Sequence, residues 1–354
     1  MVIYRLAEES DYESINAFHN RIYKSDRTAQ QFLWEFAKGP FGKAIYVIAE
    51  DEGAIVGTNC VIPIDLIDAD GQIIKSGKSE DTLVDPAYRR QKIFYHIYEF
   101  LFEKCRTAGI QVIWGFTAAK KPFRKLGFEV PYDHQQALVV NDVRRSYRYL
   151  ASLNPENKPV DKVKVLGLCL ISKAKAIGNI PSKTLPFSVK KEERIVAGVN
   201  ELVAKNQSAS GSLFAIHQTK AFQDWRIYQN PNYHQVHTYS VRKEDNLLAL
   251  IVFNVHANGV AYVCQTTFHP TLSRSEKVQI LQSATNMLFK ENVALVRNWL
   301  FDTNEANTEE AAVHQESGYT LLKRGIGLVW KVLKPLDKDP QDFYLSRIAT
   351  QGTI

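Results

Sequence analysis

The chain has 354 residues, enough for about two domains, and its 45% share of apolar residues can fill a core in each. A surplus of 44 Lys and Arg over 38 Asp and Glu gives a formal net charge of +6, which suits anionic ligands such as phosphates or acidic glycans. The sequence has no basic block interleaved with aromatic residues and no recognisable reading helix, so we do not expect a nucleic-acid partner.

The cysteines and the hydropathy of the chain restrict the cellular compartments in which we expect the protein. The four cysteines, Cys60, Cys105, Cys169 and Cys264, stand far apart and form no CxxC pair, which argues against a metal site or a disulfide framework. The chain starts on a strand-like pattern without a signal peptide, and its longest apolar run is far shorter than the roughly 18 to 20 residues that span a bilayer. We therefore expect a cytoplasmic protein with no membrane span, whose oligomeric state stays open.

The first 84 residues predict a strand, two helices and an antiparallel meander. A capping box over residues 10–13 predicts a helix to about Tyr23, and Thr28 can cap the second helix. Strands are predicted at 2–7, 46–50, 54–67 and 72–84, and tight turns with Asp and Gly separate the last three.

The stretch 79–94 joins a strand to a helix. Pro86 stops the strand because it has no N–H to donate, and from Tyr88 the apolar residues recur at helical spacing. The first N–H groups of such a helix have no partner within the helix, and here they lie beside Arg89 and Arg90. The stretch therefore predicts an anion site.

A second landmark lies at 123–128, where the sequence reads F-R-K-L-G-F. It follows a predicted buried strand at 110–116 and ends a predicted short helix at 118–126. The run V-D-P-A-Y-R-R-Q-K-I-F at 84–94 resembles motif A of the GCN5-related N-acetyltransferase (GNAT) superfamily, V-x-P-x-x-[RQ]-x-x-G-x-[GA]. The segment at 123–128 looks like the motif B of that superfamily, Y-x-x-x-G-F.

The chain departs from these motifs at three positions. Lys92 stands where the family has glycine, and Phe94 replaces the second small residue. Phe123 stands where the family often has a tyrosine that protonates the departing thiolate, and phenylalanine has no proton to give. Phe94, together with Asp81-Thr82, looks like the branch of tandem GNAT proteins often associated with polysaccharide biosynthesis.

The resemblance implies acetyl-CoA as a co-substrate, with its pyrophosphate on the backbone amides of the loop and the helix start. It also implies an oxyanion donor among the backbone N–H groups near the end of the preceding strand. The residues that it assigns to the cofactor are Leu83, Val84, Arg89, Arg90, Gln91, Lys92, Ile93 and Phe94.

Two carboxylates precede the loop and are the candidate catalytic bases. Glu80 and Asp81 are neighbours on a strand, so they point to opposite faces and only one can reach the substrate. The tandem-branch likeness of Asp81-Thr82 places Asp81 slightly ahead. For the missing acid, the alternatives are solvent or one of Tyr88, Tyr95, Tyr132 and His134.

The chain contains an internal repeat with an offset of 191 residues. Gly127 follows Trp34 by 93 residues, and Gly318 follows Trp225 by the same 93. A proline stands six residues after each tryptophan. Strands near 236–242, 247–254, 260–268 and 293–300, and a helix near 273–289, repeat the order of the first copy. We therefore expect a mixed α/β chain with two tandem GNAT folds, in which each tryptophan packs its helix onto its own sheet.

The second copy lacks the motif of the first. Its third strand leads into T-L-S-R-S-E-K, where Ser273 or Ser275 caps the next helix without a phosphate loop. His314 takes the place of Phe123 and could serve as an acid, although a partly exposed helix residue is the simpler expectation. We expect CoA to bind the first copy alone.

The connecting segment and the tail complete the expected organisation. A basic amphipathic helix at 160–176 could lie on a membrane or meet a partner, although we expect its apolar side to pack on the protein. A connector of this kind is no flexible linker, so we expect a rigid pair with the acceptor cleft between the copies. The expected parts are a GNAT domain at 1–145, the connector at 146–210, a degenerate GNAT-like domain at 211–335 and a polar, loosely held tail at 336–354 with a short helix near 341–348.

Three functions remain open from the sequence. The first is an acyl-CoA-dependent N-acetyltransferase that acts on an amine such as an amino sugar. The second is a GNAT-fold protein without catalysis that serves in binding or assembly, which the replacements at Lys92 and Phe123 would suit. The third resembles the FemX-type aminoacyl transferases, which also pair two GNAT-like halves.

Overall fold

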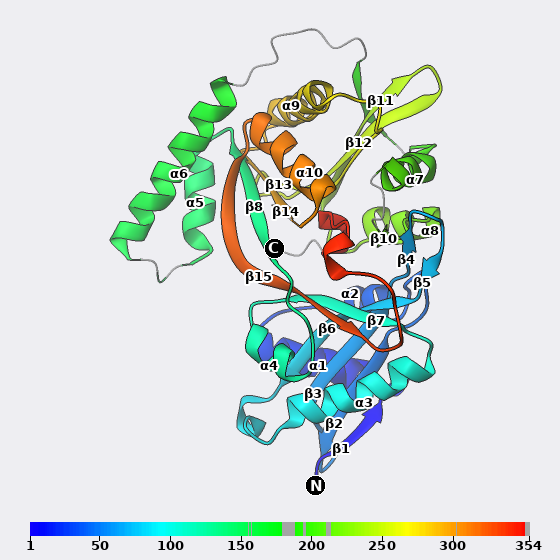
Figure 1. Ribbon diagram of the computed structural model, residues 1–354. Coiled ribbons are helices and arrows are strands. Elements are labelled where there is room, and N and C mark those ends of the chain that lie inside the picture. Colours follow the sequence, from blue (N-terminus) through cyan, green and yellow to red (C-terminus); the bar gives the residue numbers. More distant parts are fainter. Residues whose placement is uncertain are drawn as a thin grey trace. The chain divides into compact units, whose positions relative to one another are not determined.

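The computed structural model describes residues 1–154, 156, 158–178, 188–193, 196–209, 214–301 and 303–350 (Figure 1). These residues form two compact units. Unit 1 comprises Met1–Tyr132, Phe214–Asn232 and Ile326–Asp342, and unit 2 comprises Asp133–Leu213, Tyr233–Gly325 and Phe343–Ile354. Each unit takes segments from both halves of the chain, whereas the expected boundaries at 145, 210 and 335 follow one another along it. Residues 155, 157, 179–187, 194–195 and 210 of the expected connector lie outside the described residues, as do 211–213 and 302 of the expected second domain and 351–354 of the expected tail.

Unit 1 is built on a mixed sheet whose neighbouring strands are antiparallel except for one parallel pair, β6 and β7. Across the sheet the order is β1 (Ile3–Leu6), β2 (Ile45–Asp51), β3 (Ala54–Pro63), β6 (Ser76–Val84), β7 (Val112–Thr117) and the C-terminal part of β15 (Thr320–Val332). A small second sheet holds β10 (Phe214–Ile216), β4 (Leu66–Asp68) and β5 (Ile73–Ile74). The helices of the unit are α1 (Tyr12–Tyr23), α2 (Ala29–Phe36), α3 (Ile93–Thr107), α4 (Lys120–Lys125) and α8 (Lys220–Gln223).

The apolar face of α3 forms the core of unit 1. Ile97, Tyr98 and Leu101 are fully buried and pack with Val47 of β2 and Val56 of β3. Burial of this helical stripe places the start of α3 at the end of β6, where the anion site was expected.

Local capping decides where the early helices begin. Thr28 caps α2 in a capping box with Gln31, as predicted. The expected box at residues 10–13 is wrong, because Glu8 and Asp11 form the box around a short 3₁₀ turn and α1 begins only at Tyr12.

Unit 2 repeats the plan around a second sheet. Its strand order is β8 (Asp133–Val140), β14 (Leu295–Leu300), β13 (Val260–Phe268), β12 (Asn246–Val255), β11 (Gln235–Lys243) and β9 (Val189–Glu192). The helices are α5 (Val143–Ser152), α6 (Pro159–Gly178), α7 (Val199–Ala209), α9 (Arg274–Lys290) and α10 (Glu305–Glu316). Here β13 and β14 form the parallel pair, so they correspond to β6 and β7 of unit 1.

Each copy gives its last strand to the other unit. In unit 1, β7 pairs with residues Gly327–Val332 of β15, which come from the second copy. In unit 2, β14 pairs along its whole length with β8, which comes from the first copy. Each sheet is therefore completed by the other copy, and a chain cut near residue 145 would lack a strand of unit 1.

The two repeat tryptophans meet inside unit 1. Trp34 Nε1 donates to the carbonyl oxygen of Trp225 at 2.8 Å, and Trp225 Nε1 donates to that of Trp34 at 2.9 Å. Their rings are stacked with centroids 5.1 Å apart. The expectation that each packs within its own copy is wrong, because residues 214–232 of the second copy belong to unit 1. Each tryptophan ring thus donates to the backbone of the other, as expected when two repeats are related by a local twofold axis.

Residues 343–350 are buried in unit 2, so the expected loose tail is wrong. Phe343 and Leu345 are fully buried, and Asn307 Nδ2 donates to the carbonyl oxygen of Leu345 at 2.6 Å. Two 3₁₀ turns, Pro340–Asp342 and Arg347–Ala349, replace the expected helix. All four cysteines are buried, free thiols. In the described part of the chain, no helix is both long and apolar enough to cross a membrane.

Candidate active site

The two parallel strands of unit 1 separate at the site. Ser76–Lys78 of β6 pairs with Val112–Trp114 of β7, and the described pairing goes no further. At the vertex, a Cβ on Gly115 would lie 3.0 Å from the carbonyl oxygen of Ser79, so any other residue would have to push the two strands slightly apart. Beyond it a pocket of about 790 Å³ opens between the strand ends, the start of α3 and α4.

A β-bulge in β6 shapes one wall of this pocket. Cys60 of β3 faces Glu80 and Thr58 faces Leu83, so β6 contains one residue more than β3 between these pairs. Asp81, within the bulge, has a φ of 54°, a left-handed conformation that is uncommon for residues other than glycine. The Thr58 hydroxyl donates to the carbonyl oxygen of Asp81 and helps to hold it there.

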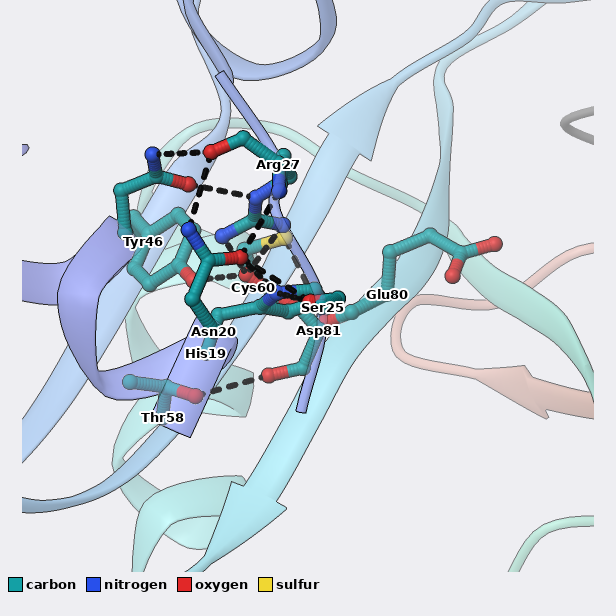
Figure 2. A network of polar contacts seen from close by, with 10 residues as sticks. His19, Asn20, Ser25, Arg27, Tyr46, Thr58, Cys60, Glu80 and Asp81 are labelled. Carbon is teal, nitrogen blue, oxygen red and sulfur yellow. Dashed lines mark hydrogen bonds and ion pairs between the residues drawn. The ribbon is translucent and has the colours of Figure 1, made fainter. Parts of the chain in front are cut away.

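The Asp81 carboxylate accepts the bonds of a buried polar network (Figure 2). Its Oδ2 accepts hydrogen bonds from both terminal nitrogens of Arg27 at 3.1 Å and from the hydroxyl of Tyr46. Its Oδ1 lies 3.5 Å from Nε2 of His19, whose pKa burial lowers. The Asp81 side chain is only 4% exposed. This carboxylate is thus better placed to fix the bulge than to take a proton from a substrate.

Glu80 points away from that network, as neighbours on a strand should (Figure 2). Its Oε1 lies 2.6 Å from Nζ of Lys78, and its side chain is 25% exposed where it lines the pocket. Lys78 is buried, and burial lowers the pKa of its ammonium group. The face beside Glu80 is therefore polar and partly open.

Glu35 of α2 adds a third carboxyl to this region. Burial, followed by the charges of Glu80 and Asp81, raises the pKa of Glu35 to about 8. Its Oε1 is enclosed and has no hydrogen-bond partner among the described residues. Sequence reasoning gives no role to Glu35, Lys78 or Arg27, and the one available signal is a glutamate inside the apolar run F-L-W-E-F.

The N-terminus of α3 is open. The helix begins at Ile93 rather than at Tyr88, because Lys92 takes the left-handed conformation with a φ of 61° and separates it from the preceding turn. Lys92 makes no side-chain cap, and among the described contacts the backbone N–H groups of residues 91–94 find no acceptor. Four consecutive free N–H groups, two just before and two at the start of a 15-residue helix, are an arrangement that favours a bound anion.

The predicted cofactor residues gather around the end of β6 and the start of α3. The side chains of Leu83 and Ile93 are buried in the core, so these two can offer only backbone groups to a ligand. Those with side chains exposed to solvent are Arg89, Arg90, Gln91 and Lys92. Those that line the pocket are Leu83, Val84, Arg89 and Phe94.

Phe123, an apolar side chain, occupies the position where the family motif often has the tyrosine that acts as the acid. Phe123 of α4 lines the pocket and packs edge-on against Phe94, with ring centroids 5.6 Å apart, and against Phe128 at 5.2 Å. Of the alternative donors, Tyr95 lines the same pocket. The Tyr88 hydroxyl instead donates to Asp51 at 3.1 Å. The two remaining candidates lie elsewhere: Tyr132 at the edge of unit 1, and His134 stacked on Trp299 in unit 2.

The equivalent helix start in unit 2 differs from that of α3. Ser273 caps α9 and Glu276 returns the bond to the backbone of Ser273, so the helix start is occupied by its own side chains. A pocket of about 630 Å³ lies nearby, and its charged lining residues are Arg274, Lys277, Glu305, Glu309 and Glu310. Here the helix start is capped by its own side chains, and both cations are paired with Glu309, in contrast to the uncapped α3 with the exposed Arg89 beside it.

His314 is fully buried, so the expected partial exposure is wrong. Its Nδ1 lies 2.9 Å from the carbonyl oxygen of Glu310, and its Nε2 lies 3.0 Å from the amide nitrogen of Asn298. Burial lowers the pKa of His314 to about 4. With both ring nitrogens engaged inside the fold, His314 serves structure and not proton transfer.

Comparison with known proteins agrees with this geometry. Residues 3–130 match the acetyltransferase (GNAT) domain family. No curated protein matches the chain. A probable N-acyltransferase from Enterococcus faecalis V583 is structurally similar, with a TM-score of 0.64 and 8% identity over 94% of this chain and 73% of that one.

Two further solved structures bear on the tandem arrangement and on the ligand. A tandem GNAT protein from the clavulanic acid biosynthesis pathway has a TM-score of 0.59 at 12% identity, over 95% of this chain and 100% of that one. The N-myristoyltransferase of Saccharomyces cerevisiae, solved with bound myristoyl-CoA, has a TM-score of 0.56 at 12% identity, over 94% and 84%. Such likeness shows the fold, and it confirms the expected mixed α/β class with two tandem copies.

Proposed function

Since residues 3–130 match the acetyltransferase (GNAT) domain family and the chain shares the fold of a tandem GNAT protein, we propose that its first copy transfers an acyl group from coenzyme A to an amine. The observation that carries the proposal is the open N-terminus of α3 at the mouth of the pocket between β6 and β7. Acetyl-CoA is the proposed co-substrate, and a small or sugar amine is the proposed acceptor. The second copy, with its self-capped helix, takes no part in holding CoA.

The CoA pyrophosphate would lie on the free N–H groups of residues 91–94. Backbone donors and the helix dipole favour an anion there, and the exposed Arg89 and Arg90 add charge-assisted contacts. Lys92 is exposed in a left-handed conformation, which lets its side chain leave the backbone surface free. This supports phosphate binding although the family glycine is missing.

The thioester would reach the gap between β6 and β7. Successive N–H groups of a strand point to opposite edges, and the N–H of Asp85 donates to Val56 on the β3 side. The N–H of Val84 therefore faces the β7 side, where the strand is unpaired. We assign the oxyanion to this donor rather than to Leu83.

Glu80 is the proposed general base, and Asp81 is the positioning residue that fixes the bulge. The amine nitrogen attacks the thioester carbonyl, its proton passes to Glu80 directly or through water, and the C–S bond breaks as the C–N bond forms. Lys78, whose Nζ lies 2.6 Å from Glu80 Oε1, holds that carboxylate in place beside the pocket. The departing thiolate takes its proton from the Tyr95 hydroxyl or from solvent.

The test uses the full chain, because the exchanged strands join the two copies. We expect CoA to raise the melting temperature, by about 2.7 kcal/mol of added stability at a hundredfold excess over its dissociation constant. Acetyl-CoA with a panel of primary amines should then release free thiol. Glu80→Gln should lower kcat by about 10²-fold or more while CoA binding stays unchanged, and Glu99→Gln, at an exposed position of α3, is the matched control.

A second candidate function is favoured by Phe123. A protein with a hydrocarbon ring at the acid position and an intact phosphate site could bind CoA without turning it over. Thermal stabilisation by CoA, with no thiol released from any amine, would select this binding role. An unchanged melting temperature at millimolar CoA would remove both candidates.

A further inference from the structure

Helix α6 of unit 2 exposes an apolar stripe. One side of the helix packs on the unit, where the Cys169 side chain is buried against α5 and the sheet. The opposite side carries large apolar groups in solvent, including Val163 at 68% exposure, Leu170 at 53% and Ile171 at 56%. The helix therefore has two apolar sides. One packs on the protein, as expected, and the other is exposed to solvent.

Helical spacing separates four bands around α6. Successive residues of a helix are about 100° apart, which places the buried Cys169 and the partly buried Val165 and Leu168 on the inner side. The outer stripe holds Val160, Val163, Leu166, Leu170, Ile171 and Ile177. Between the two bands run two pairs of lysines, Lys164 with Lys175 on one flank and Lys162 with Lys173 on the other. An apolar stripe with cations along both edges is the pattern of a helix that lies in a lipid headgroup layer.

Charge concentrates in the same hairpin. Residues 143–178 carry eight Lys and Arg against two Asp and Glu, a net of +6 that equals the formal charge of the whole chain. The neighbouring α5, which lies beside α6 (Figure 1), adds the exposed Arg144 and Arg148. A surface of this sign complements an anionic partner.

We propose that the outer stripe of α6 docks on the surface of a bilayer that contains anionic phospholipids. The apolar side chains enter the boundary between headgroups and acyl chains, and the exposed Lys162 and Lys175, one on each flank, bind lipid phosphates. The other two lysines have partners in the protein, since Lys173 donates to Asn141 and Lys164 pairs with Asp161. A second copy of the chain fits this face poorly. Two stripes in contact would bring lysine rows together, and the one acid of α6, Asp161, already pairs with Lys164 at 3.2 Å.

The experiment is co-sedimentation of the full chain with vesicles of phosphatidylcholine alone or with phosphatidylglycerol added. We expect binding to the anionic vesicles, with a loss in high salt and little binding to the neutral ones. The triple variant Val163→Ser, Leu170→Ser, Ile171→Ser should reduce the partition at least about tenfold. Lys162→Gln and Lys175→Gln should each reduce it about fivefold. The matched control, Leu6→Ser with Ile73→Ser, changes exposed apolar groups of unit 1 and should bind as the parent does.

Three results would overturn the proposal. The first is a parent chain that binds neither kind of vesicle. The second is a triple variant that sediments as the parent does, which would place the lipid contact elsewhere. The third is a concentration-dependent dimer of the parent, seen by light scattering and abolished by the triple variant, which would show a second copy on this face. Because all three positions are exposed, an unchanged melting temperature will confirm that the variant is folded.

Discussion

Helices α3 and α9 hold equivalent places in the two copies, yet they begin differently. α3 follows a left-handed Lys92 that offers no cap, so its first N–H groups are free for a ligand. α9 follows Ser273, which satisfies the N–H of Glu276 and receives a bond from that side chain in return. The fold supplies a helix N-terminus in both copies, but only in α3 are its first N–H groups left without a side-chain cap, as an anion would require.

The pockets beside these helices both contain acids and cations, but their cations differ in pairing. Glu80, Asp81 and Arg89 line the pocket of unit 1, whereas three glutamates, Arg274 and Lys277 line that of unit 2. Arg274 and Lys277 are both paired with Glu309, at 2.5 Å and 3.3 Å, and Arg89 makes no ion pair among the described contacts. If a pyrophosphate binds, it would therefore find an unpaired cation only in the pocket of unit 1.

The largest effect should come from the buried network that the second copy lacks. Asp81→Ala removes the partner of Arg27, whose side chain is 11% exposed, so about 3 to 5 kcal/mol of stability should be lost. The bulge of the second copy holds the buried, uncharged Cys264 instead, and Cys264→Ala should cost only about 1 kcal/mol. Urea unfolding of both variants makes the measurement. Equal losses would mean that the Asp81 network does not hold the bulge of the first copy.

The next effect is a pH dependence that both copies share. Burial raises the pKa of Glu35 in unit 1 and of Glu310 in unit 2 to about 8, from an ordinary value of 4.5. Between these values the folded chain holds a proton that the unfolded chain has released, so each group lowers stability as pH rises from about 4.5 to 8. The loss is at most roughly 5 kcal/mol per group.

Glutamine at either position should flatten this slope, which urea unfolding at pH 5 and pH 8 will measure. Glu80→Gln should change the pH dependence contributed by unit 1 and leave that of unit 2 as it is. It removes a charge that helps to raise the pKa of Glu35, so the contribution of Glu35 should shrink while that of Glu310 stays. If Glu35→Gln leaves the slope unchanged, Glu35 is ionised in the folded protein and the assignment fails.

More of the fold than of the candidate site could be predicted from the sequence. Hydrophobic period and motif spacing place α3, the meander and the second copy because those signals are local. They miss the exchange of β8 and β15, because a strand pattern does not say which neighbour completes its ladder. The pairing of Trp34 with Trp225 is missed for the same reason. Glu35 and Lys78 escape because their chemistry comes from burial, which depends on elements far away in the chain.

The third prediction compares the arginines at the starts of α3 and α9, Arg89 and Arg274. Arg89→Ala should weaken CoA binding about 10- to 100-fold, since a charge-assisted bond to phosphate is worth roughly 1.5 to 3 kcal/mol. Arg274→Ala at the start of α9 should leave the affinity unchanged, because that guanidinium faces Glu309 and Glu316. Titration calorimetry with CoA on the full chain compares the two. Equal weakening would place a phosphate in unit 2 and contradict the assignment to the first copy.

The smallest effect concerns the helix starts themselves. Ser273→Ala removes the cap of α9 and should cost about 1 kcal/mol, typical of a lost N-cap. Lys92→Gly acts in the opposite sense, because a left-handed residue other than glycine costs roughly 1 to 2 kcal/mol and glycine loses roughly 0.5 to 1 kcal/mol in chain entropy. A gain of up to about 1 kcal/mol is therefore expected.

Calorimetry with CoA shows what the Lys92 side chain does. If the ammonium lies over a phosphate, Lys92→Gly will weaken binding, and if it points away, the glycine will keep or improve the affinity. The exposed side chain and left-handed backbone favour the second result. Urea unfolding of the same samples measures the change in stability, so the effect of relieving backbone strain can be distinguished from the effect of losing a ligand contact. A variant of unchanged affinity and lower stability would show that Lys92 is not strained, and the difference between α3 and α9 would then rest on the missing cap alone.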